Sequence, residues 1–366
     1  MRSLQEGEIS MLRNDAHIRI GTREVGAGCP LFVIAEIGLN HGGSPEKALR
    51  MVDEAADAGA SAVKLQTLEA TMLVSAGCPA PAHVQAESLS DFFATFELDE
   101  PAHRAVADRA RARGLAFVAT PLSLDGVDLL ARVGVDAIKI ASGDLTWDAL
   151  VDRAARTGKP LIISTGMATI GEVSNAVATA RLAGADEIAL LHCVSAYPVP
   201  RGSENLRAIS TLSRSFETPV GLSDHASDTF AVPMAVALGA SIYERHLVLE
   251  GDAEAVDAAV SSTPRDLRAV VDAAARAQTA LGSGEKRCDL AEMPNLVPSR
   301  RALYAAHNLT RGQILEADDV VALRPGSGLP ANQVSRLIGL PLKCDVAFGQ
   351  PITFNHVGVR TTRRTA

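Results

Sequence analysis

Two lysines of this sequence lie inside short apolar runs, where a charged side chain is unusual and indicates a specific partner or ligand. Lys64 and Lys139 each interrupt such a run. Hydroxyl groups lie at or near the ends of several runs, namely Thr120, Ser142, Ser164 and Ser223. A buried lysine is rarely left without a partner, so lysines and hydroxyl groups together predict a site for a phosphate or a carboxylate. The alternative is that each lysine pairs with Glu36, Asp144 or Glu244 in a structural network.

Two histidines end further apolar runs. Side chains alternate along a strand, so Ser223 shares a face with His225, and Glu244 shares a face with His246. Two imidazoles at one rim could hold a divalent ion and leave positions open for water and substrate. Taken singly, such a histidine is more often a hydrogen-bonding or acid-base group. His192 is expected to be a core histidine.

Strands and helices alternate in the segments that must position these residues. Eight short β-rich runs are predicted at 33–38, 62–67, 116–121, 137–142, 160–165, 188–193, 219–224 and 241–246. Helices are predicted at 45–58, 100–113, 171–183 and 264–281. Eight such units favour a closed (β/α)8 TIM barrel over an open doubly wound sheet, and no G-x-G-x-x-G follows the first strand. Because the carboxyl ends of barrel strands form one face, the polar residues should gather there.

The remainder of the chain divides by composition. Residues 1–30 are expected to form an N-terminal extension and barrel cap, and residues 31–283 the barrel. A Gly-Ser-Gly stretch begins a linker at 284–298. Short apolar segments separated by turns predict a small, mostly β domain over 299–366.

The composition of the chain indicates which kinds of molecule it can bind and where in the cell it is expected. The formal charge of −8 over 366 residues gives no basic field for nucleic acid or an anionic membrane, which favours a small-molecule substrate. No apolar run reaches the ~18 residues of a membrane span. Five scattered cysteines and the lack of a signal-peptide pattern predict reduced thiols and a cytoplasmic location.

Ordered motifs along the chain carry a resemblance to a known family. They are IAEIGLNHGG (34–43), VKLQT (63–67), ATP (119–121), KIASGD (139–144), GKPLIISTGM (158–167), LHCVSAYP (191–198), GLSDH (221–225) and ERH (244–246). The sequence resembles N-acetylneuraminate (sialic acid) synthases and their nonulosonic-acid and spore-coat relatives. Its tail is similar to their antifreeze-like (SAF) domain, through RRAL (300–303), residues 309–319 and RPG (324–326).

The resemblance implies a reaction and a role for each residue. It implies a metal-dependent condensation of phosphoenolpyruvate with an N-acylmannosamine-like aldose, with loss of phosphate by C–O cleavage. Phosphoenolpyruvate is expected to bind to Lys64, Thr120, Lys139, Ser142, Ser164 and Ser223. The expected acid-base carboxylates are Glu36 and Asp144. The expected metal ligands are His225 and His246, with Mn²⁺ as first choice and Mg²⁺ or Co²⁺ as alternatives. The sugar is expected to contact Gln66, Tyr197, Asp257 and the partner subunit's Arg324, in a homodimer with a swapped SAF domain.

Three departures from the family pattern bear on the acceptor. Asp144 stands where many members have Glu, and Glu254-Ala-Val-Asp257 replaces a usual Gly-Pro-Asp turn. The loop 68–90 lacks an asparagine expected to contact the sugar's N-acyl group. An acceptor other than N-acetylmannosamine therefore stays open. A free sugar is expected, because no second basic cluster would serve a sugar phosphate.

Two other functions remain alternatives at this point. One is a Schiff-base lyase or aldolase that uses Lys64 or Lys139 as an amine nucleophile. The other is a non-catalytic sugar- or phosphate-binding protein, motivated by the altered loop before Asp257.

Overall fold

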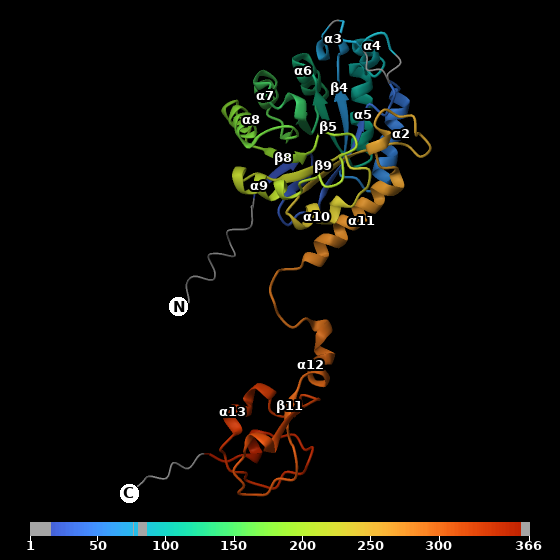
Figure 1. The fold of residues 1–366 in the computed structure, drawn as a ribbon. Coiled ribbons are helices and arrows are strands. Elements are labelled where there is room, and N and C mark those ends of the chain that lie inside the picture. The colour runs from blue at the N-terminus through green and yellow to red at the C-terminus, as the bar shows by residue number, and fades with distance from the viewer. Residues whose placement is uncertain (1–15, 76, 80–85, 360–366) are drawn as a thin grey trace. The chain divides into compact units, whose positions relative to one another are not determined.

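The first folded unit is a closed barrel of eight parallel strands. The computed structural model describes residues 16–75, 77–79 and 86–359. The strands adjoin in the order β10-β3-β4-β5-β6-β7-β8-β9. Their bounds are β3 Phe32–Gly38, β4 Ala62–Thr67, β5 Ala116–Pro121, β6 Ala137–Ile140, β7 Leu161–Ser164, β8 Ile188–Cys193, β9 Val220–Asp224 and β10 Ile242–His246. The predicted TIM barrel is confirmed, with helices around the strands (Figure 1).

The main difference in the strands lies at β6. The strand was predicted to run to residue 142, but it ends at Ile140, and Ser142–Asp144 form a 3-10 turn. In that turn, the N–H of Asp144 donates to the carbonyl of Ala141 at 3.1 Å. Ser, Gly and Asp favour turns over strands, and the apolar run before them hid this signal. Ser142 therefore lies on the loop that leaves the barrel.

Helices follow the strands and begin at clear capping residues. The four predicted helices are α2 Pro45–Asp57, α5 Glu100–Ala112, α8 Ile170–Leu182 and α11 Pro264–Leu281. The others in this unit are α3 Ala70–Leu73, α4 Leu89–Ala94, α6 Leu124–Val133, α7 Asp148–Ala155, α9 Arg207–Phe216 and α10 Ala231–Ala237. Ser44 and Thr263 cap α2 and α11, each followed by a proline at the first helical position. None of the helices in the described part of the chain is long and apolar enough to cross a membrane.

A β-hairpin covers the end of the barrel where the strands begin. Strands β1 (His17–Ile20) and β2 (Arg23–Gly26) are antiparallel. Ile18, Ile20 and Val25 of the hairpin are buried in one apolar cluster with inward-facing residues of the barrel. That apolar cluster fills the barrel interior at the end where the strands begin, and the polar residues lie toward the carboxyl ends of the strands.

Gly221 of β9 offers a test of how tightly the barrel is packed. A Cβ at this position would lie 2.3 Å from the carbonyl oxygen of Ile242 and 2.7 Å from Leu191. We expect Gly221→Ala to destabilise the protein by at least about 2 kcal/mol, because backbone must move to accept the methyl group. Gly171, on an exposed helical turn, is the matched control, and Gly171→Ala should stabilise by about 0.5–1 kcal/mol. Denaturant unfolding measures both, and equal unfolding midpoints for the two variants would contradict the packing.

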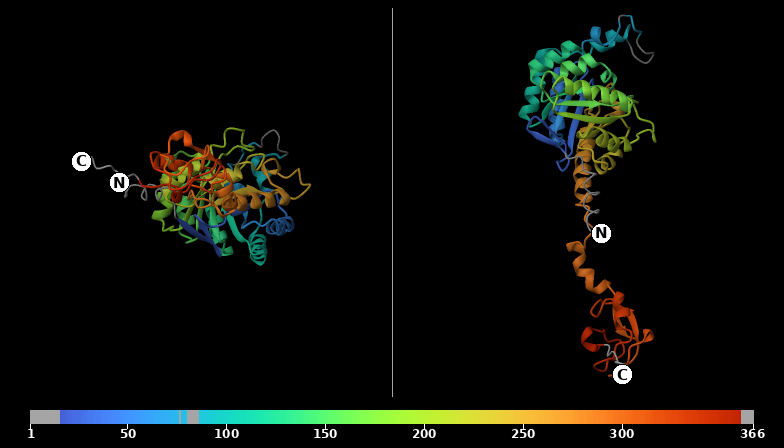
Figure 2. Two further views of the ribbon diagram at one scale, coloured as in Figure 1. Left: turned by 90° about the horizontal axis from the view of Figure 1, so that it is seen from below. Right: turned by 90° about the vertical axis from the view of Figure 1, so that its left-hand side faces the viewer.

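The second unit begins at Ser283 and has its own core. It contains α12 (Met293–Ser299), the antiparallel strands β11 (Ala302–Ala305) and β12 (Val320–Leu323), and α13 (Val334–Leu337). The segment predicted as a linker at 284–298 therefore includes most of a short helix. The core is made of buried residues such as Leu303, Leu315 and Ile352. Figure 2 shows the short elements of this unit in orange to red.

Candidate active site

A cavity of about 310 Å³ opens at the carboxyl ends of the barrel strands. This size lies at the lower end of the range for small-molecule sites. The predicted residues that line it are Glu36, Lys64, Gln66, Thr120, Lys139, Ser142, Ser164, Tyr197, Ser223, His225 and His246. The fold thus brings residues from seven strands and the loops beyond them to one place, as the closed barrel requires.

Two lysines and two carboxylates form a buried cluster at the base of the cavity. Lys64 Nζ lies 2.6 Å from Glu36 Oε2 and 3.5 Å from Glu244 Oε2. Lys139 Nζ lies 3.2 Å from Glu244 Oε1. All four residues are at most 4% exposed. The ion-pair network that the sequence left as an alternative is therefore present, but it lines the cavity and faces any ligand there.

Charge and burial compete in this cluster. Burial alone would lower the pKa of Lys64, but the carboxylates of Glu244 and Glu36 outweigh it and raise the pKa. Burial lowers the pKa of Lys139, which has Glu244 as its main partner and Lys64 as a like charge. Burial raises the pKa of Glu36, so this carboxyl keeps a proton to a higher pH than usual. For Glu244, burial is outweighed by Lys139 and Lys64, and the pKa is lowered.

Hydroxyl groups surround the cluster. Thr120 Oγ1 accepts from Lys64 Nζ at 3.2 Å, and Ser223 Oγ donates to Glu244 Oε1 at 2.9 Å. Ser142 Oγ accepts from the N–H of Gly166 at 3.1 Å. Ser164 Oγ is buried and has no hydrogen-bond partner among the described residues. A buried hydroxyl without a partner is costly, so Ser164 is available to donate to an oxyanion in the cavity.

His225 and His246 lie together at the rim, with ring centroids 5.5 Å apart. Nδ1 of His225 donates to the carbonyl of Val194 at 3.3 Å, which leaves its Nε2 free to bind a ligand. Nδ1 of His246 is buried without a hydrogen-bond partner and lies 3.3 Å from Asp257 Oδ2. Burial lowers the pKa of both histidines to about 4, so both are neutral at pH 7.

These two imidazoles have the donor chemistry of a metal site with open positions. Neutral imidazole is a common ligand of divalent transition metals. Across residues 16–75, 77–79 and 86–359, no group of three or more His, Cys, Asp or Glu side chains is arranged to hold an ion. A divalent ion held by His225 and His246 would have positions left for water or substrate. The residues fit a catalytic metal site better than a closed structural one.

Gly38 makes room for this arrangement. It has φ +55° at the end of β3, and a Cβ there would lie 3.1 Å from both Glu36 Oε1 and His246 Nδ1. A side chain at this position would push against the carboxylate and the imidazole together. The glycine of the Glu36-Ile-Gly38 motif therefore serves the geometry of the cavity.

Three predicted residues do not line the cavity. Asp144 is half-buried on its 3-10 turn, where burial raises the pKa of its carboxyl, and its short side chain is not part of the cavity wall. Asp257 lies just behind His246 and contacts it, and burial raises the pKa of Asp257. Arg324 follows β12 in the second unit and is exposed there.

Two residues that line the cavity make contacts that the sequence did not reveal. Tyr197 stacks on His225 with ring centroids 4.1 Å apart, so it covers one side of the histidine pair. Glu244 accepts from Lys139 and Ser223 and contacts Lys64, which places it at the centre of the cluster. Its spacing of two residues from His246 was the available signal, but strand alternation alone does not reveal which lysines it meets.

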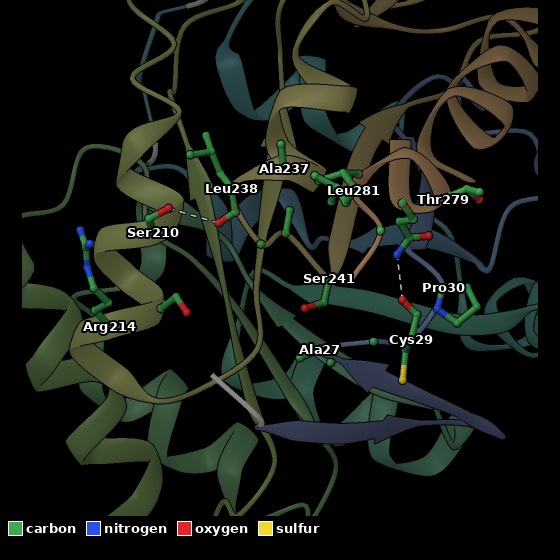
Figure 3. A pocket seen from close by; sticks show the side chains of 18 residues that line it. Ala27, Cys29, Pro30, Ser210, Arg214, Ala237, Leu238, Ser241, Thr279 and Leu281 are labelled. Atoms are coloured by element: carbon green, nitrogen blue, oxygen red, sulfur yellow. Dashed lines mark hydrogen bonds between the residues drawn. The ribbon is translucent and has the colours of Figure 1, made fainter. Parts of the chain in front are cut away.

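A second cavity, of about 660 Å³, lies at the opposite end, where β3 and β10 begin (Figure 3). In its wall, Ser210 Oγ donates to the carbonyl of Leu238 at 3.1 Å, and Gln278 Nε2 donates to that of Cys29 at 2.8 Å. Among the described residues that line it there is no carboxylate or histidine, and the one charged side chain is the exposed Arg214. Active sites of this fold lie at the carboxyl ends of the strands, so we assign chemistry to the smaller cavity.

Comparisons with known proteins agree with this architecture. The model of the NeuB family matches residues 51–286, and that of the SAF domain matches residues 300–358. The chain is 38% identical over 328 residues to an uncharacterized protein of Methanocaldococcus jannaschii, covering 90% of this chain and 95% of that protein. It is 31% identical over 346 residues to N,N'-diacetyllegionaminic acid synthase of Legionella pneumophila, covering 92% and 97%.

A solved structure gives the same result. The chain is similar to the N-acetylneuraminic acid (sialic acid) synthetase of Leptospira borgpetersenii, with a TM-score of 0.70 and 32% identity. The match covers 77% of this chain and 95% of that one. The predicted resemblance is thus confirmed, and the chain is an enzyme that belongs to the NeuB family and carries a SAF domain.

Proposed function

We propose that this enzyme condenses phosphoenolpyruvate with an N-acylmannosamine-like aldose to give a nonulosonic acid and phosphate. The observation that carries the proposal is the cavity in which two buried lysines, a serine hydroxyl without a partner and two neutral histidines meet. Relatives named as legionaminic, pseudaminic and sialic acid synthases support the same chemistry.

The lysine cluster supports an anionic substrate. Phosphoenolpyruvate carries a carboxylate and a phosphate, and both need charged or hydroxyl donors when they leave water. Lys64 and Lys139 are buried at the cavity base, and Ser164 has an unused hydroxyl beside them. On binding, the substrate would share these lysines with Glu36 and Glu244, which are their partners in the free protein.

The reaction forms one C–C bond and breaks one C–O bond. C3 of phosphoenolpyruvate bonds to the aldehyde carbon, whose oxygen takes up a proton. Water adds its oxygen to C2 and returns that proton. Phosphate then leaves C2 with the bridging oxygen and the second proton of the water, as the ketone forms. Glu36 is the first candidate for the proton donor, because its carboxyl lines the cavity and burial raises its pKa. Asp144 remains a second candidate.

A divalent ion bound by His225 and His246, Mn²⁺ first with Mg²⁺ or Co²⁺ as alternatives, would supply Lewis acidity at the sugar aldehyde. The histidines favour this use because they are neutral and adjacent. Tyr197, stacked on His225, would keep that side of the histidine pair away from water.

The acceptor is proposed to be a free sugar. Among the described residues that line the cavity, the only Lys or Arg side chains are Lys64 and Lys139, and both already face carboxylates. A sugar phosphate would bring further negative charge without a further cation. Gln66, Tyr197 and Asp257 stay predicted sugar contacts. The homodimer in which the partner subunit's Arg324 completes the site also stays a prediction.

Isotope labelling tests which bond breaks. With ¹⁸O in the bridging position of phosphoenolpyruvate, we expect the label to leave in the inorganic phosphate, as mass spectrometry or ³¹P NMR measures. Label retained in the sugar acid would mean P–O cleavage and would contradict the proposed chemistry. Unlabelled substrate in ¹⁸O-water is the matched control, and the released phosphate should then carry no label, because water adds to C2 and not to phosphorus.

The lowered pKa of Lys139 is the one observation that favours the Schiff-base alternative, since a neutral amine is nucleophilic. Borohydride reduction in the presence of pyruvate tests it. We expect no covalent adduct on Lys64 or Lys139 by peptide mass spectrometry. A reduced adduct on either lysine would move the assignment to a lyase or aldolase.

A further inference from the structure

Asn40 links the segments after β3 and β10 to the loop that carries Asp257, a predicted sugar contact. It follows β3, is 1% exposed, and does not itself line the cavity. Its Nδ2 donates to the carbonyl of Leu247 at 2.7 Å and to Ser261 Oγ at 3.0 Å. Its Oδ1 accepts from the N–H of Asp257 at 2.9 Å. One buried amide therefore uses both of its ends to join β3, β10 and the loop after β10.

The backbone of Asp257 is held on both sides by this arrangement. Its N–H donates to Asn40, and its carbonyl accepts from Ser261 Oγ at 2.7 Å. The same Ser261 hydroxyl accepts from Asn40. As a result, the carboxylate of Asp257 lies 3.3 Å from Nδ1 of His246, the residue just before Leu247.

The loop is held in part by its own turn, in which the N–H of Val260 donates to the carbonyl of Asp257 at 3.0 Å. That bond does not tie Asp257 to the barrel, whereas the contacts of Asn40 do. Ala255 and Val256 precede Asp257, and Val256 is 45% exposed. One other tether is the ion pair of Lys47 with Asp252, at 2.5 Å, but both side chains are about one-quarter exposed. A surface ion pair of this kind contributes little, whereas buried amide hydrogen bonds are costly to lose.

We propose that Asn40 is a positioning residue that fixes the carboxylate of Asp257 at the acceptor end of the cavity and so sets the affinity for the sugar. This inference rests on the proposed condensation. Asn40 acts through Asp257, to which it is hydrogen-bonded, and does not itself line the cavity. Its loss should therefore affect the sugar and leave the lysine cluster that faces phosphoenolpyruvate in place.

Asn40→Ala tests the inference by the pattern of kinetic constants. We expect the KM for the acceptor to rise by about 10- to 100-fold, the range typical when the support of a functional ligand is lost. The KM for phosphoenolpyruvate should change less than about twofold, because substitutions at sites that do not interact have nearly independent effects. The acceptor probe is N-acetylmannosamine or a 2,4-diacetamido-6-deoxy aldose, whichever supports phosphate release by the unaltered enzyme.

Two further variants keep the test decisive. Ser261→Ala removes the hydroxyl that links Asn40 to the carbonyl of Asp257 but keeps the hydrogen bond from the N–H of Asp257 to Asn40. It should therefore raise the acceptor KM by less than Asn40→Ala does. It also provides a second test if Asn40→Ala folds poorly. Lys47→Ala is the matched control, because it removes the other tether of the same loop and should leave both KM values within about twofold. Equal rises in both substrates' KM, or no rise in the acceptor KM for Asn40→Ala and Ser261→Ala, would overturn the inference.

Hydrogen exchange separates this inference from the proposed function. In the free enzyme, Asn40→Ala should speed amide exchange across residues 255–258 by at least about tenfold and leave the strands unchanged. If the unaltered enzyme releases no phosphate with any sugar, the proposed function fails, and exchange still decides the role of Asn40. If exchange in this loop is unchanged, the positioning role fails whatever the activity.

Discussion

Replacing Lys139 by methionine is expected to lower kcat/KM for phosphoenolpyruvate by about 10²- to 10³-fold, as loss of one donor to a developing anion does. Methionine keeps much of the length of the side chain but removes the ammonium group that lies 3.2 Å from Glu244. The same change removes one of the positive charges that balance the buried carboxylate of Glu244, so the free energy of unfolding should fall by about 3 kcal/mol. Steady-state phosphate release and denaturant unfolding measure the two effects.

A double variant separates substrate binding from a purely structural network. Lys139→Met combined with Glu244→Gln removes both charges of the pair, so most of the lost stability should return. If Lys139 binds phosphoenolpyruvate, activity should stay low while stability recovers. Recovery of activity together with stability would show that the lysine is only a structural partner. Lys343→Met, an exposed lysine in the second unit, is the control for a lost charge.

Replacing His225 by alanine is expected to abolish metal-stimulated phosphate release and to weaken Mn²⁺ binding by more than about 100-fold. Loss of a residue that only supports a metal ligand costs up to about 100-fold, and loss of the ligand itself should cost more. The reason is that His225 and His246 are the two imidazoles that lie together at the cavity rim. Calorimetry on EDTA-treated protein measures binding without reference to activity. His246→Ala should behave in the same way.

His192 provides the control for this pair. It lies on the neighbouring strand β8, and its Nε2 contacts the carbonyl of Glu204 at 2.8 Å. His192→Gln should keep the affinity for Mn²⁺ within about threefold of that of the unaltered enzyme, because substitutions that do not touch a site have small effects on it. Equal Mn²⁺ affinity in His225→Ala and the unaltered enzyme would place the metal elsewhere.

The barrel was predictable because each strand and helix carries its own local signal. All eight predicted strand regions hold barrel strands, since short apolar runs and turn residues mark them separately. Strand β6 ended early because a Ser-Gly-Asp turn overrode the apolar pattern at Ser142. The short helices α3, α4, α12 and α13 were not predicted, since segments of four to seven residues show too little periodicity.

The contents of the site were predictable in part, for a geometric reason. Period-two alternation and the barrel rule placed Lys64, Lys139 and the two histidines at one rim. Neither rule says which partners meet across the barrel, so the central place of Glu244 came only with the structure. The same holds for Asn40, whose contacts join residues more than 200 positions apart in sequence. The role of each individual residue was predicted from the resemblance alone, and the variants described above test those roles.

Release of phosphate from phosphoenolpyruvate is the direct test of the proposed condensation. The purified protein would be stripped with EDTA, and Mn²⁺ would be added back across a panel of aldoses that includes N-acetylmannosamine, its 6-phosphate and a 2,4-diacetamido-6-deoxy sugar. We expect release that needs both the metal and one unphosphorylated sugar. Release without a sugar, release without metal, or no release with any sugar despite binding of phosphoenolpyruvate would contradict this proposal.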